Sequence, residues 1–217
     1  MQLIIGNKRY SSWSLRPWLL MRHFDLPFDE IMVNLYQGDT RAERLTYSPT
    51  GKVPALIDDG ALVWESLAIL DYLAERFPQL PLWPAERIAR AHARSIAAEM
   101  HAGFGALRQA MPTNFCARLP GRGHTDAALA DVARVVELVS DCRTRFGGTG
   151  RFLFGEFGIA DAMYAPVATR LVTYGVQLPP LVRDWVDALY ALPAMNEWLQ
   201  AAESEPLIRS AEPYADA

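Results

Sequence analysis

Residues 51–66 read Gly51-Lys52-Val53-Pro54-Ala55-Leu56-Ile57-Asp58-Asp59-Gly60-Ala61-Leu62-Val63-Trp64-Glu65-Ser66. Two β-prone runs flank the Asp59-Gly60 pair, a pattern typical of a tight hairpin. Pro54 stands at the start of the first run, where a proline is tolerated because no ladder hydrogen bond is required of it. The neighbouring backbone groups of Val53 are then available to a ligand. We therefore predict a β-hairpin with a recognition edge at Val53-Pro54.

A helix is predicted directly after the hairpin. Leu67, Leu70 and Leu73 recur at helical spacing, and Ser66 suits the N-cap position, with Glu65 just before it. The free N–H groups and partial positive charge of a helix N-terminus favour an anion such as a carboxylate. A helix start beside a proline-led strand edge is thus predicted to hold a short anionic peptide.

The hairpin and the helix together resemble the glutathione-binding half of cytosolic glutathione transferases, through residues 51–56 and 65–73. The resemblance implies a cis Val53-Pro54 bond, a Val53 backbone that pairs with the cysteinyl part of glutathione, and a Glu65-Ser66 pair that holds its γ-glutamyl end. Lys52, from its place before this edge, is a candidate for the glycyl carboxylate. The alternative is a thioredoxin-like subdomain without a ligand, since a fold alone does not carry function.

Length and composition indicate a globular protein of one large or two small domains. The chain has 217 residues, of which 51% are hydrophobic and 21% charged. The net charge of −4 gives no general attraction to nucleic acid or anionic membranes. Residues 1–6 lack the features of a signal peptide and no apolar run reaches the length of a membrane span. We therefore expect a cytoplasmic protein with neither nucleic acid nor membrane as a partner.

The cysteines and histidines are not spaced as metal ligands. Cys116 and Cys142 are the two cysteines, and neither belongs to a C-x-x-C pair. We expect buried thiols rather than a disulfide or a redox pair. The four histidines are expected at the surface or in the core, with no metal site.

The first part of the chain is predicted to have the order βαβαββα. Strands are expected at 3–5 and 28–35, with helices at 15–24 and 40–45 before the hairpin. This order describes an α/β thioredoxin-like domain, a mixed sheet covered by helices. Ser14 suits the N-cap of the first helix because Pro17 then falls in the first turn. A start nearer Ser12 would place Pro17 inside the helix.

A proline-rich segment, 77–84, is expected to link two domains. The predicted division is a thioredoxin-like glutathione-binding domain at 1–76 and an all-helical substrate and dimer domain at 85–217. Helices are expected in the second domain at 86–111, 126–146, 158–174, 181–192 and 194–203. Asp161 is expected to reach back to the N-cap backbone in a structural role. This two-domain plan resembles that of the same transferase family.

The chemistry of such an enzyme requires an ionised thiol near neutral pH. Lowering a thiol pKa of about 8.5 by about two units requires roughly 2.7 kcal/mol. A hydroxyl hydrogen bond to the thiolate supplies about 1.5–3 kcal/mol, and a helix N-terminus adds about 0.3–1 kcal/mol. One serine at the start of the first helix can therefore nearly suffice.

Residues 10–16, Tyr10-Ser11-Ser12-Trp13-Ser14-Leu15-Arg16, resemble the motif of the zeta class (maleylacetoacetate isomerases) and, less closely, the tau class. In both, the catalytic serine stands five residues before an arginine of the first helix. Counting back from Arg16 gives Ser11, with Ser12 next. Tyr10 remains an alternative, because other classes use a tyrosine at the end of the first strand.

The chain departs from the zeta pattern at two places. Trp13 stands where zeta enzymes usually carry a cysteine, and we expect it in the binding site. The substrate-binding arginine expected after the proline of the central helix falls on Thr173, with Arg170 only a loose substitute. The candidates for an electrophile site are apolar: Trp13, Phe104, Met111 and Phe115. The alternative is that they belong to the core, as aromatic and Met residues at helical spacing more often do.

We therefore predict a homodimeric glutathione transferase of detoxification, which activates glutathione as a thiolate for attack on a small hydrophobic electrophile. One alternative is a glutathione-dependent cis–trans isomerase of the maleylacetoacetate type. Another is a non-enzymatic module that uses the fold for protein contacts. A disulfide reductase is disfavoured because the position five before Arg16 is a serine rather than a thiol.

Overall fold

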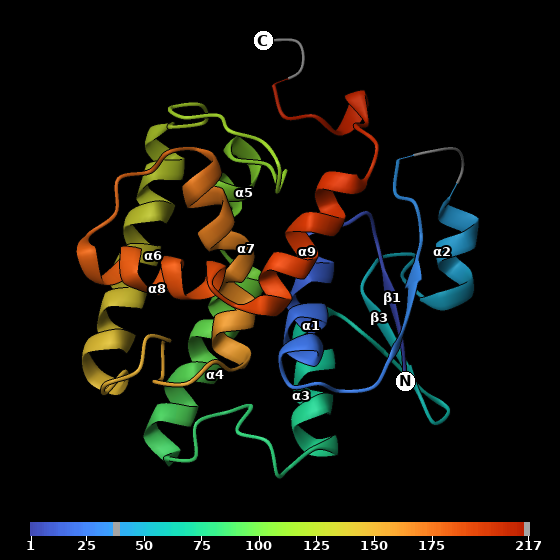
Figure 1. Cartoon of the computed structure of the whole chain (residues 1–217), viewed down its shortest axis with the longest axis horizontal. Coiled ribbons are helices and arrows are strands. Elements are labelled where there is room, and N and C mark those ends of the chain that lie inside the picture. The colour runs from blue at the N-terminus through green and yellow to red at the C-terminus, as the bar shows by residue number, and fades with distance from the viewer. Residues whose placement is uncertain (37–39, 215–217) are drawn as a thin grey trace.

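The computed structural model describes residues 1–36 and 40–214, and in it a sheet-containing part lies beside a purely helical part (Figure 1). The last residues of the predicted helical domain, 215–217, lie outside this description. The elements of the first part are β1 (Gln2–Ile5), α1 (Ser12–His23), β2 (Asp29–Met32), α2 (Arg41–Tyr47), β3 (Ala55–Asp58), β4 (Ala61–Trp64) and α3 (Ser66–Arg76). The predicted α/β order βαβαββα is confirmed.

The sheet has the strand order β2-β1-β3-β4. β1 pairs with β2 in parallel and with β3 in antiparallel orientation. β3 and β4 form the predicted hairpin, with Asp58 opposite Ala61. Between them Asp59 and Gly60 both have positive φ, 48° and 85°, the combination that a two-residue turn needs to match strand twist.

Alternation along the strands divides their side chains between two cores. Leu3, Ile5 and Leu56 join the large core that α1 and α3 cover. Ile4 and Ala55, which point the other way, join a small cluster on the side of α2. This period of two is the normal geometry of a strand, and it leaves both faces of the sheet covered.

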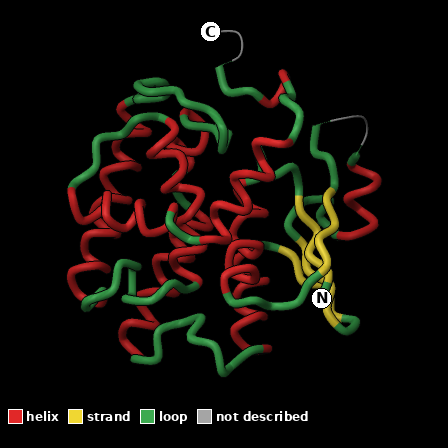
Figure 2. Tube along the Cα trace, viewed as in Figure 1, coloured by secondary structure: helices red, strands yellow, loops and turns green. Residues whose placement is uncertain are grey.

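The second part is built around α7 (Figures 1 and 2). Its helices are α4 (Arg87–Ala102), α5 (Gly105–Ala110), α6 (Asp126–Phe146), α7 (Ile159–Thr173), α8 (Pro180–Tyr190) and α9 (Pro193–Ser204), followed by a 3₁₀ turn at Arg209–Ala211. α1 packs against both α7 and α9. One hydrophobic core therefore runs through both parts and fixes the position of α1 between them.

Two predicted helix starts differ from the observed ones. Ser11, not Ser14, is the N-cap of α1, so Pro17 lies inside this helix. Ser66 is the first residue of α3, and the cap position falls on Glu65. In α1 the serine-rich loop offers several hydroxyls, and Ser11 is the one that accepts a hydrogen bond from a first-turn N–H group.

Two further predictions of length were wrong. The helix expected over 86–111 is divided into α4 and α5 at Gly103 and Phe104, because Phe104 adopts a left-handed conformation with φ of 57°. β2 ends at Met32, short of the expected residue 35. The division redirects the chain, so the side chains of α4 and α5 are not on one helical face.

The segment after α9, residues 205–214, returns to the loop between β1 and α1 (red in Figure 1). The Glu205 carboxylate accepts hydrogen bonds from the backbone N–H groups of Lys8 at 2.7 Å and Arg9 at 3.1 Å. The hydroxyl of Tyr214 donates to the carbonyl of Ala110. The C-terminal segment therefore fastens the loop that carries the serine motif.

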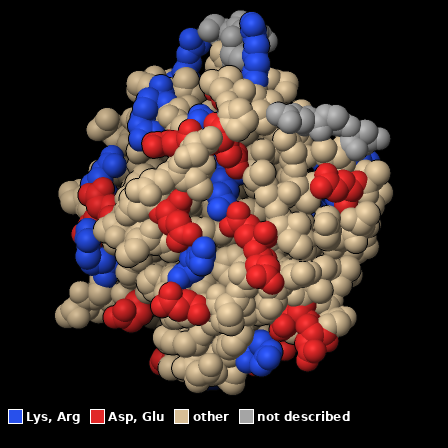
Figure 3. All heavy atoms as spheres, turned by 45° about the vertical axis from the view of Figure 1, so that its right-hand side comes forward, with Lys and Arg blue, Asp and Glu red and all other residues tan. Residues whose placement is uncertain are grey.

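Charged side chains of both signs are interspersed on the face shown in Figure 3. Within residues 1–36 and 40–214, no helix has the length and apolar character needed to cross a membrane. Cys142 is buried and Cys116 half-buried, and both are free thiols.

Candidate active site

Two adjoining cavities lie where the sheet meets the helical part. The first, of about 310 Å³, is lined by Trp13, Thr50, Lys52, Val53, Pro54, Glu65, Ser66, His101 and Arg108. The second, also about 310 Å³, is lined by Tyr10, Ser11, Ser12, Trp13, Leu35, Tyr36, Arg44, Gly51, Lys52 and Val53. The two share Trp13, Lys52 and Val53. All eight predicted site residues thus line one or both of these cavities.

The strand edge at Val53-Pro54 has the geometry of a recognition edge. The peptide bond between these residues is cis. The pairing of β1 with β3 ends at Ile4 and Ala55, so Val53 lies beyond the last paired residue. Because it borders both cavities, a peptide ligand can continue the pairing where the protein's own ladder stops.

Ser11 combines a helix cap with a position at the cavity. Its oxygen accepts a hydrogen bond from the Ser14 N–H at 3.4 Å, and its hydroxyl donates to Ser14 Oγ at 2.7 Å. Ser14 Oγ also accepts from the Gly6 N–H at 3.0 Å. A hydroxyl can rotate its proton to another acceptor while its oxygen keeps accepting. Ser11 can therefore serve an anion in the cavity without losing its capping bond.

Ser12 is held differently, by a side chain of the helical part. Its Oγ accepts from Arg170 Nη2 of α7 at 3.4 Å. Ser12 lines the second cavity and is nearly buried. Its hydroxyl proton remains available, so geometry alone keeps Ser12 as the second candidate.

The hydroxyl of Tyr10 is engaged by the C-terminal segment. It donates to Glu212 Oε1 and accepts from the Ile208 N–H at 3.0 Å. Burial and the hydrogen bond to the Glu212 carboxylate raise the pKa of Tyr10 to about 12. Both polar roles of this hydroxyl are thus taken by groups of the protein itself, so Tyr10 is the weakest of the three candidates for contact with the thiolate.

The start of α3 carries an unsatisfied polar group. Ser66 is fully buried, and its Oγ has no hydrogen-bond partner within the described residues. Glu65 has a φ of 69°, a conformation that strains any residue with a side chain. Its carboxylate lies 3.6 Å from His101 Nε2 of α4. The two residues therefore present an acid and a free hydroxyl to the first cavity.

Three residues of the first cavity were not predicted: Thr50, His101 and Arg108. The ring of His101 packs edge-on against Trp13, with centroids 5.5 Å apart. The Arg108 guanidinium lies 5.5 Å from the Trp13 ring centroid. Both come from the region where one continuous helix was expected, and the signal for its division at Phe104 was the pair of flanking glycines, Gly103 and Gly105.

The other apolar candidates for the electrophile site belong to the core. Phe104, Met111 and Phe115 are buried, and none of them lines either cavity. Trp13, Leu35 and Tyr36 supply the apolar surface instead. Of the two alternatives for these three residues, the structure supports the core, and only Trp13 of the four candidates lines a cavity.

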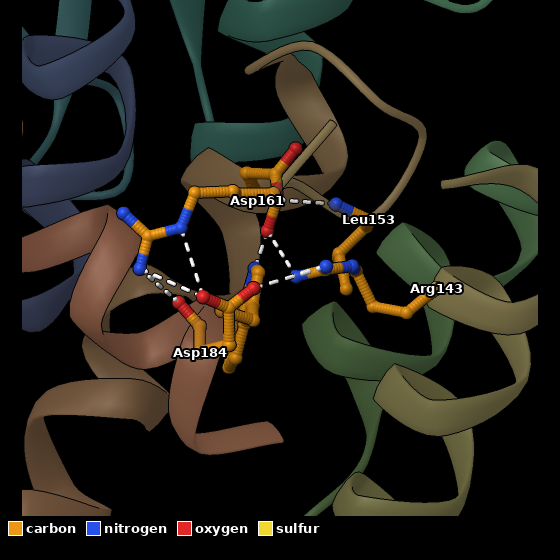
Figure 4. A network of polar contacts seen from close by, with 6 residues as sticks. Arg143, Leu153, Asp161 and Asp184 are labelled. Atoms are coloured by element: carbon orange, nitrogen blue, oxygen red, sulfur yellow. Dashed lines mark hydrogen bonds and ion pairs between the residues drawn. The ribbon is translucent and has the colours of Figure 1, made fainter. Parts of the chain in front are cut away.

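The carboxylate of Asp161 is the centre of a separate, structural network (Figure 4). It accepts hydrogen bonds from the N–H groups of Leu153 at 3.0 Å and Gly158 at 3.2 Å and from Trp185 Nε1 at 2.9 Å. The bond from Gly158 is the predicted return to the N-cap backbone. Burial raises the pKa of Asp161 to about 6, against the opposing effect of these donors.

Within residues 1–36 and 40–214, no cluster of three histidine, cysteine, aspartate or glutamate side chains is arranged to hold a metal ion.

Comparison with known proteins identifies the family. Residues 10–76 match the family described as "Glutathione S-transferase, N-terminal domain", and residues 67–201 match "Glutathione S-transferase, C-terminal domain". The second match alone covers more than half of the chain. The protein therefore belongs to the glutathione S-transferase family, a family of transferase enzymes that use glutathione as co-substrate, and the family prediction is confirmed.

Individual relatives agree with this assignment. A maleylacetoacetate isomerase of Pseudomonas aeruginosa is 29% identical over 91% of this chain and 94% of its own length. The glutathione S-transferase GstB of Escherichia coli is 26% identical over 88% of each chain. A probable maleylacetoacetate isomerase of Caenorhabditis elegans is 36% identical, but this match covers only 43% of the chain and 42% of that relative.

Solved structures share the fold. A glutathione transferase homolog from Burkholderia, with bound glutathione, superposes with a TM-score of 0.72 at 24% identity and covers 94% of this chain and 98% of its own. A maleyl pyruvate isomerase of the zeta class superposes with a TM-score of 0.71 at 21% identity, over 95% and 100%. The thioredoxin-like and helical fold class is thereby confirmed.

Proposed function

We propose that the protein activates glutathione as a thiolate for attack on a small hydrophobic electrophile. The observation that carries the proposal is the convergence of three features on two cavities with shared walls. These features are the Ser11 start of α1, the Val53-Pro54 edge and the Glu65-Ser66 start of α3. A strand edge can pair with the backbone of a short peptide. A free buried hydroxyl can bind its carboxylate, and an acidic side chain can bind its amine.

Each predicted residue then has one role. The Val53 backbone pairs with the cysteinyl part of glutathione, and Pro54 and Trp13 form walls. Lys52 binds the glycyl carboxylate. The Glu65 carboxylate binds the γ-glutamyl amine, while Ser66 Oγ and the N-terminus of α3 bind the γ-glutamyl carboxylate.

Ser11 stabilises the thiolate by donating its hydroxyl hydrogen bond to the sulfur. This bond contributes about 1.5–3 kcal/mol, and its position at the N-terminus of α1 adds about 0.3–1 kcal/mol. With an aryl halide, the sulfur forms the new bond to the ring carbon and the halide leaves with the bonding electron pair. The proton lost from the thiol passes to solvent before the attack.

Substitution of the two serines tests this role. With glutathione and 1-chloro-2,4-dinitrobenzene, Ser11→Ala is expected to lower kcat/KM by about 10- to 150-fold, the equivalent of the lost hydrogen bond. The apparent pKa of bound glutathione, read from the pH profile, is expected to rise. Ser12→Ala is the matched control and should retain most of the activity. Full activity in Ser11→Ala would refute the assignment.

A second candidate is a glutathione-dependent cis–trans isomerase, favoured by the relative named maleylacetoacetate isomerase that matches nearly the whole chain. In such a reaction the thiolate adds to a double bond, the bond rotates and the thiolate leaves again, so glutathione is not consumed. Arg170, the loose substitute for the zeta arginine, is held by the carbonyls of Met111 and Pro166. Loss of glutathione thiol during turnover separates transfer from isomerisation.

We further infer a cytoplasmic homodimer that acts in detoxification. The proposed division of labour is glutathione binding by 1–76, a linker at 77–84, and electrophile binding and dimer contacts by 85–217. The support is the resemblance to the family and the position of the cavities between the two parts. Light scattering at micromolar concentration tests the dimer, and a single-chain mass at all concentrations would contradict it.

A further inference from the structure

The serine motif is preceded by a tight turn that begins at Asn7. The carbonyl of Asn7 accepts hydrogen bonds from the N–H groups of Tyr10 at 3.1 Å and Ser11 at 2.8 Å. The second of these bonds ties the backbone of Ser11, the N-cap of α1, directly to the turn. The N–H groups of the two central residues, Lys8 and Arg9, find no acceptor within such a turn. They therefore need an acceptor from another part of the chain.

Glu205, the residue directly after α9, is that acceptor. Its carboxylate uses one oxygen for the Lys8 N–H at 2.7 Å and the other for the Arg9 N–H at 3.1 Å. In return, Arg9 Nη2 donates to the carbonyls of Glu203 and Glu205, both at 3.2 Å. The end of α9 thus holds the turn through its backbone and through a side chain, across about 195 positions of sequence.

α9 is itself fixed beside the turn by aromatic packing. Trp198 of α9 packs edge-on against Trp18 of α1, with ring centroids 5.0 Å apart, and both side chains are fully buried. The Lys8 ammonium lies 4.9 Å from the Trp18 ring centroid and 5.6 Å from that of Trp198, and 2.8 Å from the Glu30 carboxylate. Close-packed side chains of this kind move little, so Glu205 holds the turn from a fixed position.

We propose that Glu205 is a positioning residue for the reaction, which fixes the turn and thereby sets the distance and direction of the Ser11 hydroxyl toward the glutathione sulfur. Glu205 lines neither cavity, so it acts through Ser11 and not by contact with the substrate. A hydrogen bond weakens steeply with distance and angle, and a misplacement of about 1 Å can cost about 100-fold in rate. This inference rests on the proposed function and adds to it a residue from the far end of the chain.

The direction of the effect separates positioning from two other roles of a carboxylate. Removal of a nearby negative charge by itself favours the thiolate and lowers the pKa of bound glutathione. A role in folding alone leaves that pKa unchanged. Loss of positioning weakens the hydrogen bond from Ser11 and raises that pKa, so only this role predicts an increase.

Glu205→Ala tests the proposal. The apparent pKa of bound glutathione, read from the pH profile and from the ultraviolet absorbance of the thiolate, is expected to rise by about 0.5–1 pH unit. With 1-chloro-2,4-dinitrobenzene, kcat/KM should fall about 3- to 10-fold at a pH below that pKa, while KM for glutathione changes less than about 2-fold. Glu205→Gln keeps one acceptor oxygen and should show a smaller rise. Glu203→Ala, an exposed position two residues earlier, is the control for the same loss of charge.

A double-mutant cycle shows whether Glu205 acts through Ser11. In Ser11→Ala no hydroxyl remains to be positioned, so the further change Glu205→Ala should alter the apparent pKa by less than about 0.2 pH unit. Independent, additive increases in the two variants would overturn the proposal. So would an unchanged or lowered pKa in Glu205→Ala while Ser11→Ala raises it, and in that case the proposed function stands. No change in Ser11→Ala would refute the role of Ser11 itself, and with it that of Glu205.

Hydrogen exchange measures the turn without glutathione. Amides of residues 7–12 are expected to exchange about 10-fold faster or more in Glu205→Ala than in the wild type or Glu203→Ala, because two of them lose their acceptor. Amides of the hairpin at 55–64 should be unaffected, which separates local loosening of the turn from general unfolding. Equal exchange at 7–12 in Glu205→Ala and Glu203→Ala would overturn the proposal, whatever the protein's activity.

Discussion

Helices α3 and α7 both begin with a carboxylate residue at or near the first turn, but the polar groups at the two starts differ in their partners. At α7, Asp161 accepts three hydrogen bonds from its own chain. At α3, Ser66 Oγ is buried without a partner among the described residues, and Glu65 is held in a left-handed conformation. The Asp161 carboxylate at the α7 start is thus fully hydrogen-bonded, whereas the Ser66 hydroxyl at the α3 start has no partner among the described residues.

This difference is what we expect between a helix start with a structural role and one with the proposed binding role. Buried polar groups in folded proteins are normally satisfied, and strained backbone persists where the surroundings impose it, often at ligand sites. We therefore expect the α7 start to contribute to stability and, as proposed above, the α3 start to bind the ligand. Substitutions at the two starts should accordingly affect different properties.

The largest expected effect is on stability, at α7. Asp161→Ala leaves the donors of Leu153, Gly158 and Trp185 without an acceptor. Because each orphaned buried donor costs about 1–3 kcal/mol, we expect the free energy of unfolding to fall by about 3–5 kcal/mol. Urea denaturation measures it, with the exposed Asp187→Ala of α8 as control. A loss no larger than that of the control would show that the network is not structural.

The pH dependence of stability gives a second, slightly smaller effect at the same residue. In the folded protein the pKa of Asp161 is raised from 3.8 to about 6, so the folded state binds this proton more tightly than the unfolded state. Its contribution to stability is then complete below pH 3.8 and is lost as the pH rises toward 6. The shift corresponds to about 3 kcal/mol.

Comparison with Asp161→Asn isolates this contribution. The free energy of unfolding of the wild type minus that of the variant, from urea titrations between pH 4 and pH 7, should decrease as the pH rises. A difference that increases with pH would mean that the three hydrogen-bond donors lower the pKa of Asp161 by more than burial raises it.

At α3 the expected effect is on binding rather than on folding. Glu65→Ala removes the proposed partner of the glutathione amine, and a hydrogen bond to a charged group contributes about 1.5–3 kcal/mol, or about 10- to 150-fold in KM for glutathione. The free energy of unfolding should change by less than about 0.5 kcal/mol. Glu75→Ala, at an exposed position of the same helix, is the matched control. An unchanged KM for glutathione together with a lowered free energy of unfolding would show that Glu65 has a structural role instead of a binding role.

The sequence predicted the sheet side of the site better than the helical side. The hairpin, its proline and the following helix lie within residues 51–73, where local turn chemistry and spacing determine the structure. The wall formed by His101 and Arg108 depends on the left-handed Phe104 between α4 and α5. A phenylalanine carries no preference for that conformation, but the flanking Gly103 and Gly105 are residues that often end helices, so residue type offered a signal that was not used.

The loop before α1 was only partly predicted, because its conformation also depends on contacts between residues that are distant in the sequence. The motif singled out Ser11, but the proline was placed in the first turn and the cap on Ser14. In the folded chain, contacts of α1 with α7 and α9 and the C-terminal segment fix the loop. These contacts join residues about 150–200 positions apart, beyond the reach of local patterns.

The start of α1 is a third helix start that can be compared with those of α3 and α7. A substitution there, Tyr10→Phe, has the smallest expected effect. Tyr10 donates its hydroxyl to Glu212 and accepts from Ile208, so its polar group is satisfied as at α7. Tyr10→Phe should therefore lower the free energy of unfolding by about 0.5–1.5 kcal/mol and leave the apparent pKa of bound glutathione unchanged. Tyr190→Phe, whose hydroxyl has no hydrogen bond among the described residues, is the control. A rise in that pKa as large as in Ser11→Ala would transfer thiolate stabilisation to Tyr10, because only a hydroxyl directed at the sulfur changes its ionisation by such an amount.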